Sequence, residues 1–372
     1  MKRILHVVPS LELGGTEAFI MNHYRSMNRQ EIQFDFLVCA KKDWPYLKEI
    51  DRLGGRVFYT ARPSILRLGS FLAGMKQAIR EGGPYAAIHC HADADNAVPI
   101  LCGAICGVKK RIAHLHAIDQ MPERLSRKWF HYVKKWLIKA FATDVWACSE
   151  EAGNSFVGAD YFGKNGKVIR NGISLDRFLL VDEAHKQALK EEFHISDDQP
   201  VLGNITRFDE NKNQLFLVEV FKNLLTQHPE ALLILGGTDG GKLQQVKDYV
   251  AENDLEKNVR FIGRRNDVPE WLSLMDVYVF PSVFEGLGIA LLEAQAAGCL
   301  CVASTGVPMD TDMGLGTAHY LPLSEGAAGW AAFLSVKLDK KQKPVQSDIR
   351  KAFGEKHFDI NESCKELVKY YG

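Results

Sequence analysis

The sequence lacks the features that mark several classes of protein. Its 46 lysine and arginine residues balance its 46 aspartate and glutamate residues, so global charge indicates no nucleic-acid partner. No apolar run approaches the roughly 18 residues that a membrane-spanning helix requires. Internal repeats and low-complexity tracts are also absent. The apolar N-terminal stretch is short and is broken by His6 and Pro9, which predicts a first strand and argues against a signal peptide.

Two absent motifs exclude further chemistries. The eight cysteines form no Cys-x-x-Cys pair and lie mostly in apolar runs, which is typical of reduced, buried thiols in a cytoplasmic protein. The dinucleotide fingerprint Gly-x-Gly-x-x-Gly does not follow the first strand, which counts against a nicotinamide enzyme.

The 372 residues predict about two domains. Short apolar runs rich in β-formers alternate with amphipathic segments, which is the pattern of parallel sheets covered by helices. The sequence therefore predicts an α/β fold with two doubly wound parallel sheets. The expected strands are residues 3–8, 33–39, 56–59, 87–90, 111–115, 144–147 and 167–169, and then 200–204, 231–235, 259–262, 276–280 and 299–303.

One stretch of the second half places glycines and glutamates at the start of a predicted helix. A strand-like run over residues 276–282 precedes Glu285-Gly286-Leu287-Gly288, and the helical pattern then ends at Gly298. Free backbone N–H groups and the positive end of a helix dipole make such a loop an anion site. Glu285 and Glu293 bracket it, and carboxylates accept hydrogen bonds from sugar hydroxyls. This combination indicates a nucleotide sugar.

The Glu-x7-Glu pattern in this setting resembles the signature of retaining glycosyltransferases of family 4. Other landmarks of that family follow in the expected order along nearly the whole chain. They are Gly14-Gly15-Thr16-Glu17, His116, Val168-Ile169-Arg170-Asn171-Gly172-Ile173 with Asp176, and Gly203-Asn204-Ile205-Thr206-Arg207-Phe208 with Lys212-Asn213. One such motif is weak evidence, whereas the ordered set is specific.

The resemblance implies the GT-B fold, in which two Rossmann-like domains face each other across a cleft. By this analogy residues 1–171 bind the acceptor, residues 172–357 bind the donor, and a terminal helix over 358–372 packs back on the first domain. The implied activity is a retaining hexosyltransferase that moves a sugar from a UDP- or GDP-sugar to a glycan or lipid-linked acceptor. Bacterial surface polysaccharide synthesis is the implied context. Asn171-Gly172 is the expected pivot, with Gly172 supplying backbone freedom.

The donor site is expected around the second-half strand ends, where ligands bind in doubly wound sheets. Arg207 and Lys212 follow the first of these strands and are expected to clamp the diphosphate; solvated surface charges are the alternative. Backbone N–H groups of Gly286, Leu287 and Gly288 would join them. The resemblance assigns Glu285 to hydroxyls of the transferred sugar and Glu293 to the ribose.

Four further positions take their roles from the resemblance. Gly14 and Gly15 resemble the N-terminal glycine loop that reaches the diphosphate or the acceptor. His116 matches a histidine beside the transferred sugar, with a structural role as the alternative. Val268 lies in the 263–268 loop, whose backbone binds the nucleobase in the family, so side chains there do not identify the base.

Two patterns contain metal-ligating residue types, and we expect a metal at neither. His89-Cys90-His91-Ala92-Asp93-Ala94-Asp95 includes Asp-x-Asp, but neighbours in a strand point to opposite faces, so His89 and Cys90 do not share a metal. Asp310-Thr311-Asp312 lies where relatives carry Gly-x-Pro-Glu, and here Met309 follows Pro308. We expect no cofactor and a reaction that survives chelators.

A predicted helix near residues 124–140 carries a basic face. We expect its apolar side to pack on the sheet and its cations to face anionic lipid headgroups, each worth about 1 kcal/mol. This places the protein in the cytoplasm, peripherally on the inner face of the membrane. No base-stacking pattern supports nucleic acid as the partner. The cations are Arg124, Arg127, Lys128, Lys134, Lys135 and Lys139, and the apolar side comprises Leu125, Trp129, Tyr132, Val133, Trp136 and Ala140.

Two other functions share this fold. A non-catalytic partner subunit of another transferase should have lost parts of the donor site, whereas this chain keeps Arg207, Lys212, Glu285 and Glu293. A nucleotide-sugar 2-epimerase would be recognised by a C2-epimeric product.

Overall fold

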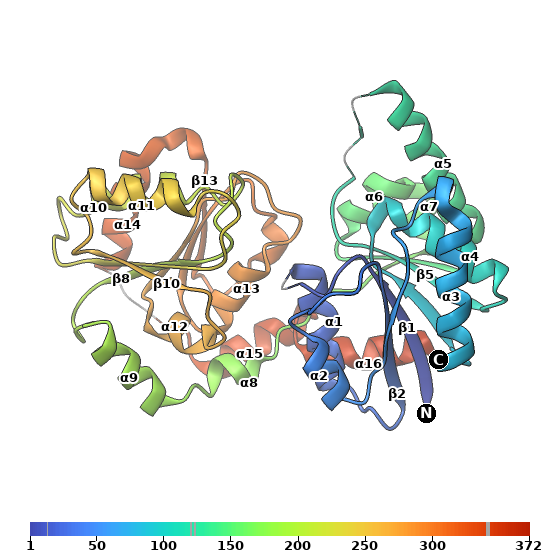
Figure 1. Ribbon diagram of the computed structural model, residues 1–372. Coiled ribbons are helices and arrows are strands. Elements are labelled where there is room, and N and C mark those ends of the chain that lie inside the picture. Colours follow the sequence, from blue (N-terminus) through green and yellow to red (C-terminus); the bar gives the residue numbers. More distant parts are fainter. Residues whose placement is uncertain (13, 120, 123, 340–342) are drawn as a thin grey trace. The chain divides into compact units, whose positions relative to one another are not determined.

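The structure is a computed structural model that describes residues 1–12, 14–119, 121–122, 124–339 and 343–372. It divides into two compact units (Figure 1). The first comprises Met1–Gly172 and Ile360–Gly372, and the second comprises Ile173–Asp359. These borders lie one residue after the predicted border at 171 and two residues after the predicted return at 358.

Among the described residues, the first unit is built on a seven-stranded parallel sheet in the order β3-β2-β1-β4-β5-β6-β7. Its strands are β1 (Lys2–Val8), β2 (Ile32–Val38), β3 (Val57–Tyr59), β4 (Ala87–Cys90), β5 (Lys110–Leu115), β6 (Asp144–Ala147) and β7 (Gly166–Val168). Its helices are α1 (Gly15–Ser26), α2 (Leu47–Arg52), η1 (Ile65–Arg67), α3 (Leu68–Gly82), η2 (Asp93–Asn96), α4 (Ala97–Ile105), α5 (Leu125–Phe141), α6 (Glu150–Val157), α7 (Ala159–Asn165) and α16 (Ile360–Tyr371).

The second unit repeats this architecture with a six-stranded parallel sheet, again counted over the described residues, in the order β10-β9-β8-β11-β12-β13. Its strands are β8 (Val201–Ile205), β9 (Leu232–Gly236), β10 (Val259–Gly263), β11 (Val277–Phe280), β12 (Leu300–Ser304) and β13 (Ala318–Leu321). Its helices are α8 (Leu175–Leu179), α9 (Glu183–Glu192), α10 (Gln214–Leu224), α11 (Leu243–Glu252), α12 (Val268–Leu274), α13 (Ile289–Ala296), η3 (Met309–Thr311), η4 (Leu323–Glu325), α14 (Gly326–Leu338) and α15 (Gln346–Glu355).

The prediction of two doubly wound α/β units is confirmed. Every expected strand is present, with each end within one residue of its predicted position. β13 was not predicted from the sequence. It lies at the edge of the second sheet, and its residues are all only partly buried. A short edge strand of this kind lacks the continuous apolar run that identifies a strand buried on both faces.

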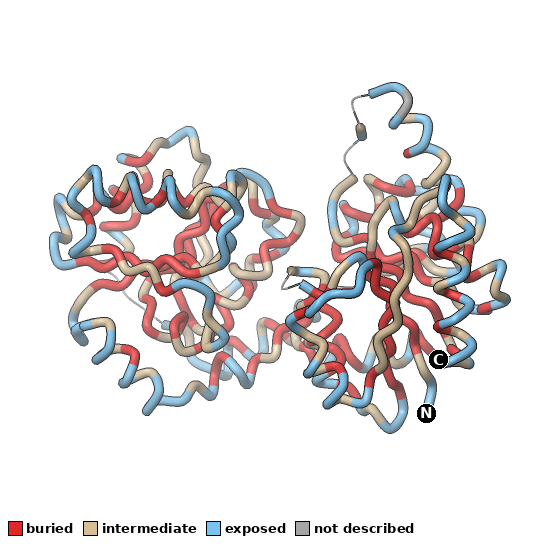
Figure 2. Tube along the Cα trace, in the orientation of Figure 1, coloured by how far each residue is buried: buried red, intermediate tan, exposed pale blue. Residues whose placement is uncertain are grey.

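Side chains alternate between the two faces of the first sheet, so that each face has its own core. Leu5 and Val7 of β1 pack with residues of α3, α4, α5, α6 and α7, whereas Ile4 and Val8 pack with α1 and α16. The terminal helix α16 belongs to this unit and buries Ile360, Cys364, Leu367 and Tyr371 there. Figure 2 shows the strands of both sheets as buried and the outer sides of most helices as exposed.

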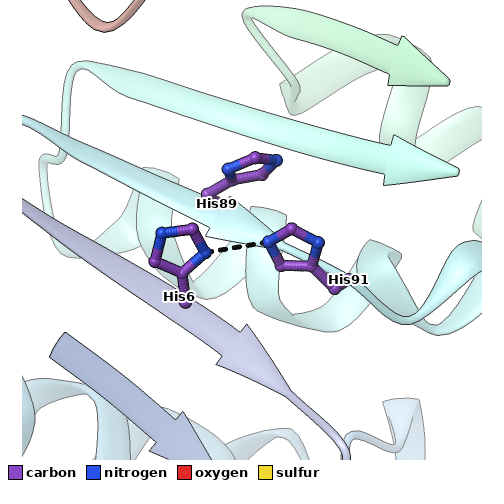
Figure 3. Close-up of side chains that lie close together, drawn as sticks. All are labelled: His6, His89 and His91. Atoms are coloured by element: carbon purple, nitrogen blue, oxygen red, sulfur yellow. Dashed lines mark hydrogen bonds between the residues drawn. The ribbon is translucent and has the colours of Figure 1, made fainter. Parts of the chain in front are cut away.

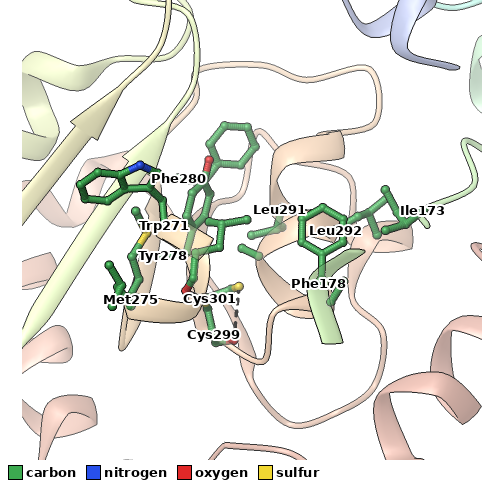
Figure 4. Packing of buried hydrophobic residues seen from close by; sticks show 14 of the residues in the cluster. Ile173, Phe178, Trp271, Met275, Tyr278, Phe280, Leu291, Leu292, Cys299 and Cys301 are labelled. Atoms are coloured by element: carbon green, nitrogen blue, oxygen red, sulfur yellow. Dashed lines mark hydrogen bonds between the residues drawn. The ribbon is translucent and has the colours of Figure 1, made fainter. Parts of the chain in front are cut away.

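The second sheet is also covered on both faces. One core joins β11 to α8, α12, α13 and α15, and Figure 4 shows Trp271, Tyr278, Leu291 and Leu292 packed together within it. The other core joins the sheet to α10, α11 and α14. Leu291 and Leu292 of α13 are fully buried. Each contributes about 1.5–3 kcal/mol of hydrophobic free energy, and this packing holds α13 against the sheet.

Gly172 is required for a reason other than the one expected from the sequence. Its φ is not among the positive values found in the chain, so it does not use the conformational freedom of glycine. A Cβ atom at this position would lie 2.7 Å from the Cα atom of Ile360. Gly172 therefore allows a close approach between the end of the first segment and the start of α16. The proposed pivot at Asn171-Gly172 stays a prediction.

Candidate active site

The order of the strands places the candidate residues of the second unit together. In doubly wound sheets ligands bind beyond the carboxyl ends of the strands, where the strand order reverses. In the second unit this point lies between β8 and β11, which are neighbours in the sheet. The loop after β8 carries Arg207 and Lys212, and the loop after β11 carries Glu285 and Gly286.

Lys212 and Glu285 form an ion pair in this region. The Lys212 Nζ atom lies 2.5 Å from the Glu285 Oε1 atom, and their side chains are only 20% and 11% exposed. The Lys212 ammonium group also lies 5.2 Å from the centre of the Phe280 ring. The pair is therefore a semi-buried cation and anion held against the end of β11.

Asn211 holds the two loops together. Its backbone carbonyl accepts a hydrogen bond of 2.8 Å from the Val283 N–H group, and its Oδ1 atom accepts one of 3.0 Å from Phe284. Its Nδ2 group donates to the Phe284 carbonyl. Asp209 fixes the same loop by accepting hydrogen bonds from the backbone N–H groups of Asn211 and Lys212. Neither Asn211 nor Asp209 was predicted from the sequence to shape the site, although asparagine and aspartate often form such hydrogen bonds in loops.

The loop between β11 and α13 offers backbone donors. The Glu285 N–H group donates to the Gly306 carbonyl, but no hydrogen bond to another described residue is found for the N–H groups of Gly286, Leu287 and Gly288. Gly288 precedes α13 with a φ of 83°. Unpaired N–H groups before a helix N-terminus are the arrangement that binds phosphate oxygens.

Glu293 lies in the second turn of α13, and its carboxyl group is partly desolvated. Burial raises the pKa of its carboxyl to about 7, and the positive charge of Arg177 opposes the shift. Within the described parts of the chain, no hydrogen bond or ion pair to this carboxyl is found. By accessible surface the Glu293 side chain is only partly buried, and a carboxylate without a protein partner is available to accept hydrogen bonds from the hydroxyl groups of a ligand.

Arg207 has a different carboxylate partner from Lys212. Its guanidinium donates to Asp209 at 2.8 Å, and its side chain is 65% exposed. Both cations therefore have a carboxylate partner in the structure: Lys212 is semi-buried and paired with Glu285, whereas Arg207 is exposed and paired with Asp209. Their expected role as a diphosphate clamp stays a prediction. The sequence places both cations after β8 but does not reveal these partners.

Val268 begins α12, directly after the 263–268 loop. Gly263 has a φ of 63°, and Asp267 accepts hydrogen bonds from Arg265 and His185 at distances of 2.5–2.8 Å. These contacts lower the pKa of Asp267 to about 2, with the Arg265 hydrogen bond as the largest cause. Arg265 and Asp267 are thus engaged with one another, and recognition of the nucleobase by the backbone of this loop stays a prediction.

His116 of the first unit is one of a cluster of histidines on the α1 and α16 side of the sheet. A ring nitrogen of His116 lies 2.9 Å from His91, and a second ring nitrogen of His91 lies 2.9 Å from His6. A parallel row joins Tyr371 of α16 to His89 at 2.6 Å and His89 to His114 at 3.0 Å. Burial lowers the pKa of His116 to about 3, so its imidazole is neutral at physiological pH.

The histidine cluster contains the groups best suited to hold a metal in the described residues. Ligand atoms of His6, His89 and His91 lie within 4.8 Å of one another (Figure 3). Those of His91, His114 and His116 also lie within 4.8 Å of one another. Hydrogen bonds between the imidazoles occupy most of these nitrogen atoms, and no carboxylate belongs to either group. His89 packs on the opposite face of the sheet from Cys90. The expectation that catalysis needs no metal stays a prediction.

The two aspartates of the Asp-x-Asp pattern have other partners. Asp93 accepts a hydrogen bond of 2.7 Å from the His116 backbone N–H group, and Asp95 pairs with Lys134 at 2.5 Å. Asp93 thereby fixes the strand end that carries His116, while Asp95 fixes α5.

Gly14 and Gly15 form the start of α1, next to a buried acid that the sequence analysis did not single out as a site residue. Glu17 is 8% exposed and accepts a hydrogen bond of 2.6 Å from Ser10. Burial raises the pKa of this carboxyl. A Cβ atom on Gly14 would lie 2.6 Å from the Glu17 Oε2 atom, so a side chain at this position would displace the Glu17 carboxylate. Glu17 could have been identified from the sequence as an acidic residue in the first turn of a helix that follows two glycines.

The predicted orientation of α5 is wrong. Lys134 and Lys135 are not free cations: they pair with Asp95 and Asp119 at 2.5 Å on the inner side of the helix. The side chains expected to pack on the sheet are instead mostly exposed, with exposed fractions of 86% for Leu125, 63% for Trp129, 60% for Tyr132 and 62% for Trp136. Among the described side chains of α5, those of His131, Leu137 and Ile138 are buried.

Comparisons with known proteins agree with this architecture. The family described as "Glycosyltransferase Family 4" matches residues 13–177, and "Glycosyl transferases group 1" matches residues 185–313. EpsF of Bacillus subtilis, named as a candidate glycosyltransferase, is 32% identical over 378 residues, covering 100% of this chain and 96% of its own. The chain belongs to glycosyltransferase family 4.

Two further family resemblances extend over most of this glycosyltransferase. The UDP-Gal:alpha-D-GlcNAc-diphosphoundecaprenol alpha-1,3-galactosyltransferase of Escherichia coli is 26% identical over 315 residues, covering 81% of this chain and 79% of its own. The crystal structure of Anabaena HepE in complex with UDP and glucose superposes with a TM-score of 0.81 at 19% identity, covering 100% and 99% of the two chains. The second likeness shows the GT-B fold. Among the described residues, no helix has the length and apolar character needed to cross a membrane.

Proposed function

We propose that this glycosyltransferase moves a hexose from a UDP-sugar to a glycan or lipid-linked acceptor with retention of configuration and without a metal. The observation that carries the proposal is the Lys212–Glu285 pair beside the free N–H groups of Gly286–Gly288. A diphosphate bound there would take Lys212 as its counter-ion and release Glu285 to bind sugar hydroxyls.

The relatives favour UDP as the nucleotide. HepE, which shares the fold, has been crystallised with UDP and with UDP-glucose, and the Escherichia coli relative is named for a UDP-galactose donor. A GDP-sugar is the alternative donor. In this chain, the unpartnered Glu293 carboxyl on α13 supplies an acceptor for the two ribose hydroxyls of either nucleotide.

The chemical step needs charge stabilisation more than a protein nucleophile. In the proposed step the bond between the sugar C1 atom and the phosphate oxygen breaks, and its electron pair goes to the departing diphosphate. The acceptor hydroxyl oxygen attacks C1 from the same face, and its proton passes to the departing phosphate oxygen. Lys212, Arg207 and the loop N–H groups stabilise the developing negative charge. His116, neutral through burial, would contact the transferred sugar.

The names of the relatives also favour a role in bacterial surface polysaccharide synthesis. The Escherichia coli enzyme is named for an undecaprenol-linked acceptor, and a Staphylococcus aureus relative, 26% identical over 312 residues, is named for capsular polysaccharide biosynthesis. All eight cysteines are free thiols, and seven are buried, which fits a reducing compartment. We place the reaction in the cytoplasm, on the inner face of the membrane, in bacterial surface polysaccharide synthesis.

A screen of UDP-, GDP- and ADP-sugars tests the proposal. A UDP-sugar present at 100 times its Kd should stabilise the donor unit by about 2.7 kcal/mol, a rise in Tm of roughly 5–10 °C. The product formed in excess EDTA should keep the anomeric configuration of the donor. Inverted product, or activity that is lost in EDTA and restored by manganese, contradicts the mechanism. UDP binding without transfer favours a non-catalytic subunit, and a C2-epimeric nucleotide sugar favours an epimerase.

A further inference from the structure

The outer side of α5 carries an apolar stripe that nothing in the structure covers. Leu125, Trp129, Tyr132 and Trp136 are spaced four, three and four residues apart, so they lie along one side of the helix, and each is at least 60% exposed. We call these four side chains the α5 stripe. In Figure 2 the first turns of α5, at the top of the first unit, are largely exposed.

This concentration is unusual within the chain. Five of the fifteen large apolar side chains found exposed among the described residues belong to α5, if Phe130 is added to the stripe. Monomeric proteins commonly expose single apolar residues, but a contiguous exposed patch marks an interaction site. The remaining four tryptophans of the chain are all buried, so Trp129 and Trp136 are the exposed ones.

Cations border the stripe and acids do not. Lys128 and Lys139 lie along one edge of the stripe, and Arg124 and Arg127 lie near its N-terminal end. Within the described residues none of these four forms an ion pair with a carboxylate. No acidic residue occurs between Arg124 and Lys139. The surface is therefore apolar and aromatic at its centre and positive at its edge.

The orientation of α5 is fixed from the inner side. Lys135 and His131 both contact the Asp119 carboxylate, at 2.5 and 3.0 Å, and Lys134 pairs with Asp95 of η2. Leu137 and Ile138 pack into the core of the first sheet. The helix cannot rotate to bury the stripe without breaking these contacts, so the stripe stays on the outside.

We propose that α5 is a membrane-docking helix that inserts the α5 stripe into the headgroup region of an anionic bilayer. Tryptophan and tyrosine prefer this region because their rings are apolar and their N–H and O–H groups are polar. Lysine side chains bury their methylene groups while their ammonium groups reach anionic headgroups. A helix with aromatic residues on one side and cations at the edge lies in the plane of the interface. This inference concerns the first unit alone and does not depend on the donor site.

Vesicle co-sedimentation with a fluorescence readout tests the proposal. The full-length protein should bind phosphatidylcholine vesicles containing about 30% phosphatidylglycerol, and tryptophan emission should shift to the blue on binding. Because the other tryptophans are already buried, the shift reports Trp129 and Trp136. The Trp129→Ser/Trp136→Ser variant should lose the shift and bind at least about tenfold more weakly. The matched control is Leu66→Ser/Leu180→Ser, which replaces side chains that are 84% and 67% exposed elsewhere.

The charge requirement is tested separately. Lys128→Glu/Lys139→Glu should weaken binding to the same vesicles by at least about 30-fold, since each cation near the surface contributes about fivefold. Lys351→Glu, at a side chain 75% exposed on α15, should leave binding unchanged. The Tm of each variant is measured first, and binding is compared only among variants whose Tm equals that of the wild-type protein. This excludes a folding defect as the cause of weaker binding.

Three results would overturn the proposal. They are a failure of the wild-type protein to bind anionic vesicles, equal binding by the double tryptophan variant, and a wild-type dimer in light scattering that this variant converts to a monomer. The last would assign the stripe to a second copy of the chain. None of these results bears on UDP binding, which thermal shift measures independently.

Discussion

The Lys212 ammonium group lies 2.5 Å from the Glu285 carboxylate, although 73 residues separate the two positions in the chain. The strand order brings them together, because β8 and β11 are neighbours and their following loops meet at the carboxyl edge of the sheet. Asn211 then joins the loops through three hydrogen bonds. The pair is therefore a product of the fold and sits where an anionic leaving group would bind.

Replacing Lys212 with alanine should reduce turnover strongly. Loss of one positioned donor to a developing anion costs at least about 2 kcal/mol of transition-state stabilisation, or roughly 30-fold in kcat. The variant also leaves Glu285 semi-buried without its cation. Steady-state kinetics with a UDP-sugar provide the measurement, and Lys222→Ala is the control, because Lys222 donates a hydrogen bond to Asn253 at an exposed site. A Lys212→Ala enzyme with near-normal kcat contradicts the assignment.

Glu293 should make stability and donor binding depend on pH in opposite directions. Its pKa of about 7 exceeds the usual value of 4.5 for a glutamate. Between pH 4.5 and pH 7 the native state therefore keeps a proton that the unfolded chain has released. The free energy of unfolding therefore falls as pH rises from 4.5 to 7 and stays low above 7. Glu293→Gln should stabilise the unliganded protein by roughly 1–3 kcal/mol at pH 8 and have little effect at pH 4.

Donor affinity should show the opposite trend, because ribose hydroxyls donate to the ionised carboxylate. The ligand should be a UDP-sugar, because its diphosphate, unlike the terminal phosphate of UDP, does not titrate between about pH 6 and pH 8. Calorimetry should find that its binding strengthens over this range in the wild-type protein and is weaker, with a smaller pH dependence, in Glu293→Gln. Equal affinity in both proteins at pH 8 would remove Glu293 from the donor site.

Gly288 should not tolerate a side chain. Its φ is 83°, and an added Cβ atom would lie 3.1 Å from Val307 and 3.3 Å from Phe280. Gly288→Ala should destabilise the second unit by about 1–2 kcal/mol and weaken UDP binding, since it distorts the phosphate loop. Gly354→Ala on α15 is the matched control: no atom lies near its added Cβ, and alanine favours helix, so it should stabilise by about 0.5–1 kcal/mol. Equal unfolding midpoints for the two variants would contradict this account.

The buried histidines should make the first unit sensitive to acid. Burial lowers the pKa of His6 and His116 to about 3 and that of His23 to about 4, whereas the unfolded value is 6.5. The unfolded chain therefore binds more protons below pH 6.5, and stability falls as pH falls through this range. Each such histidine costs about 2 kcal/mol at pH 5.

Circular dichroism and proton-uptake titration should therefore show cooperative unfolding of the first unit near pH 5, with several protons bound. His23→Gln should reduce the proton uptake by about one. His185→Gln is the control, because His185 is exposed and its hydrogen bond to Asp267 raises its pKa. Unfolding without proton uptake would contradict the neutral state of the cluster.

Backbone features of this protein follow readily from its sequence. Strands such as β4 and β11 are short apolar runs buried on both faces, and glycines mark the start of α1 and α13. Because parallel strands end at a common edge, the loops after them are also placed by order alone. This reasoning located Lys212 and Glu285 in the same region before their contact was known.

Side-chain partners were harder to foresee because they depend on tertiary packing. The helical pattern of α5 separates an apolar side from a basic one but does not say which faces inward. Asp95 and Asp119, which lie outside the helix, decide this by pairing with Lys134 and Lys135. The histidine rows arise in the same way, since His6, His89 and His114 come from three strands adjacent only in the folded sheet. Arg207 pairs with Asp209, two residues later in the same loop, and the family motif does not specify this partner.

A crystal structure of the protein with UDP tests the central claim most directly. The account predicts that the β-phosphate lies within hydrogen-bonding distance of Lys212 and of the N–H groups of Gly286–Gly288, with the ribose hydroxyls on Glu293. Phosphorus atoms bound away from Lys212 and this loop would contradict it.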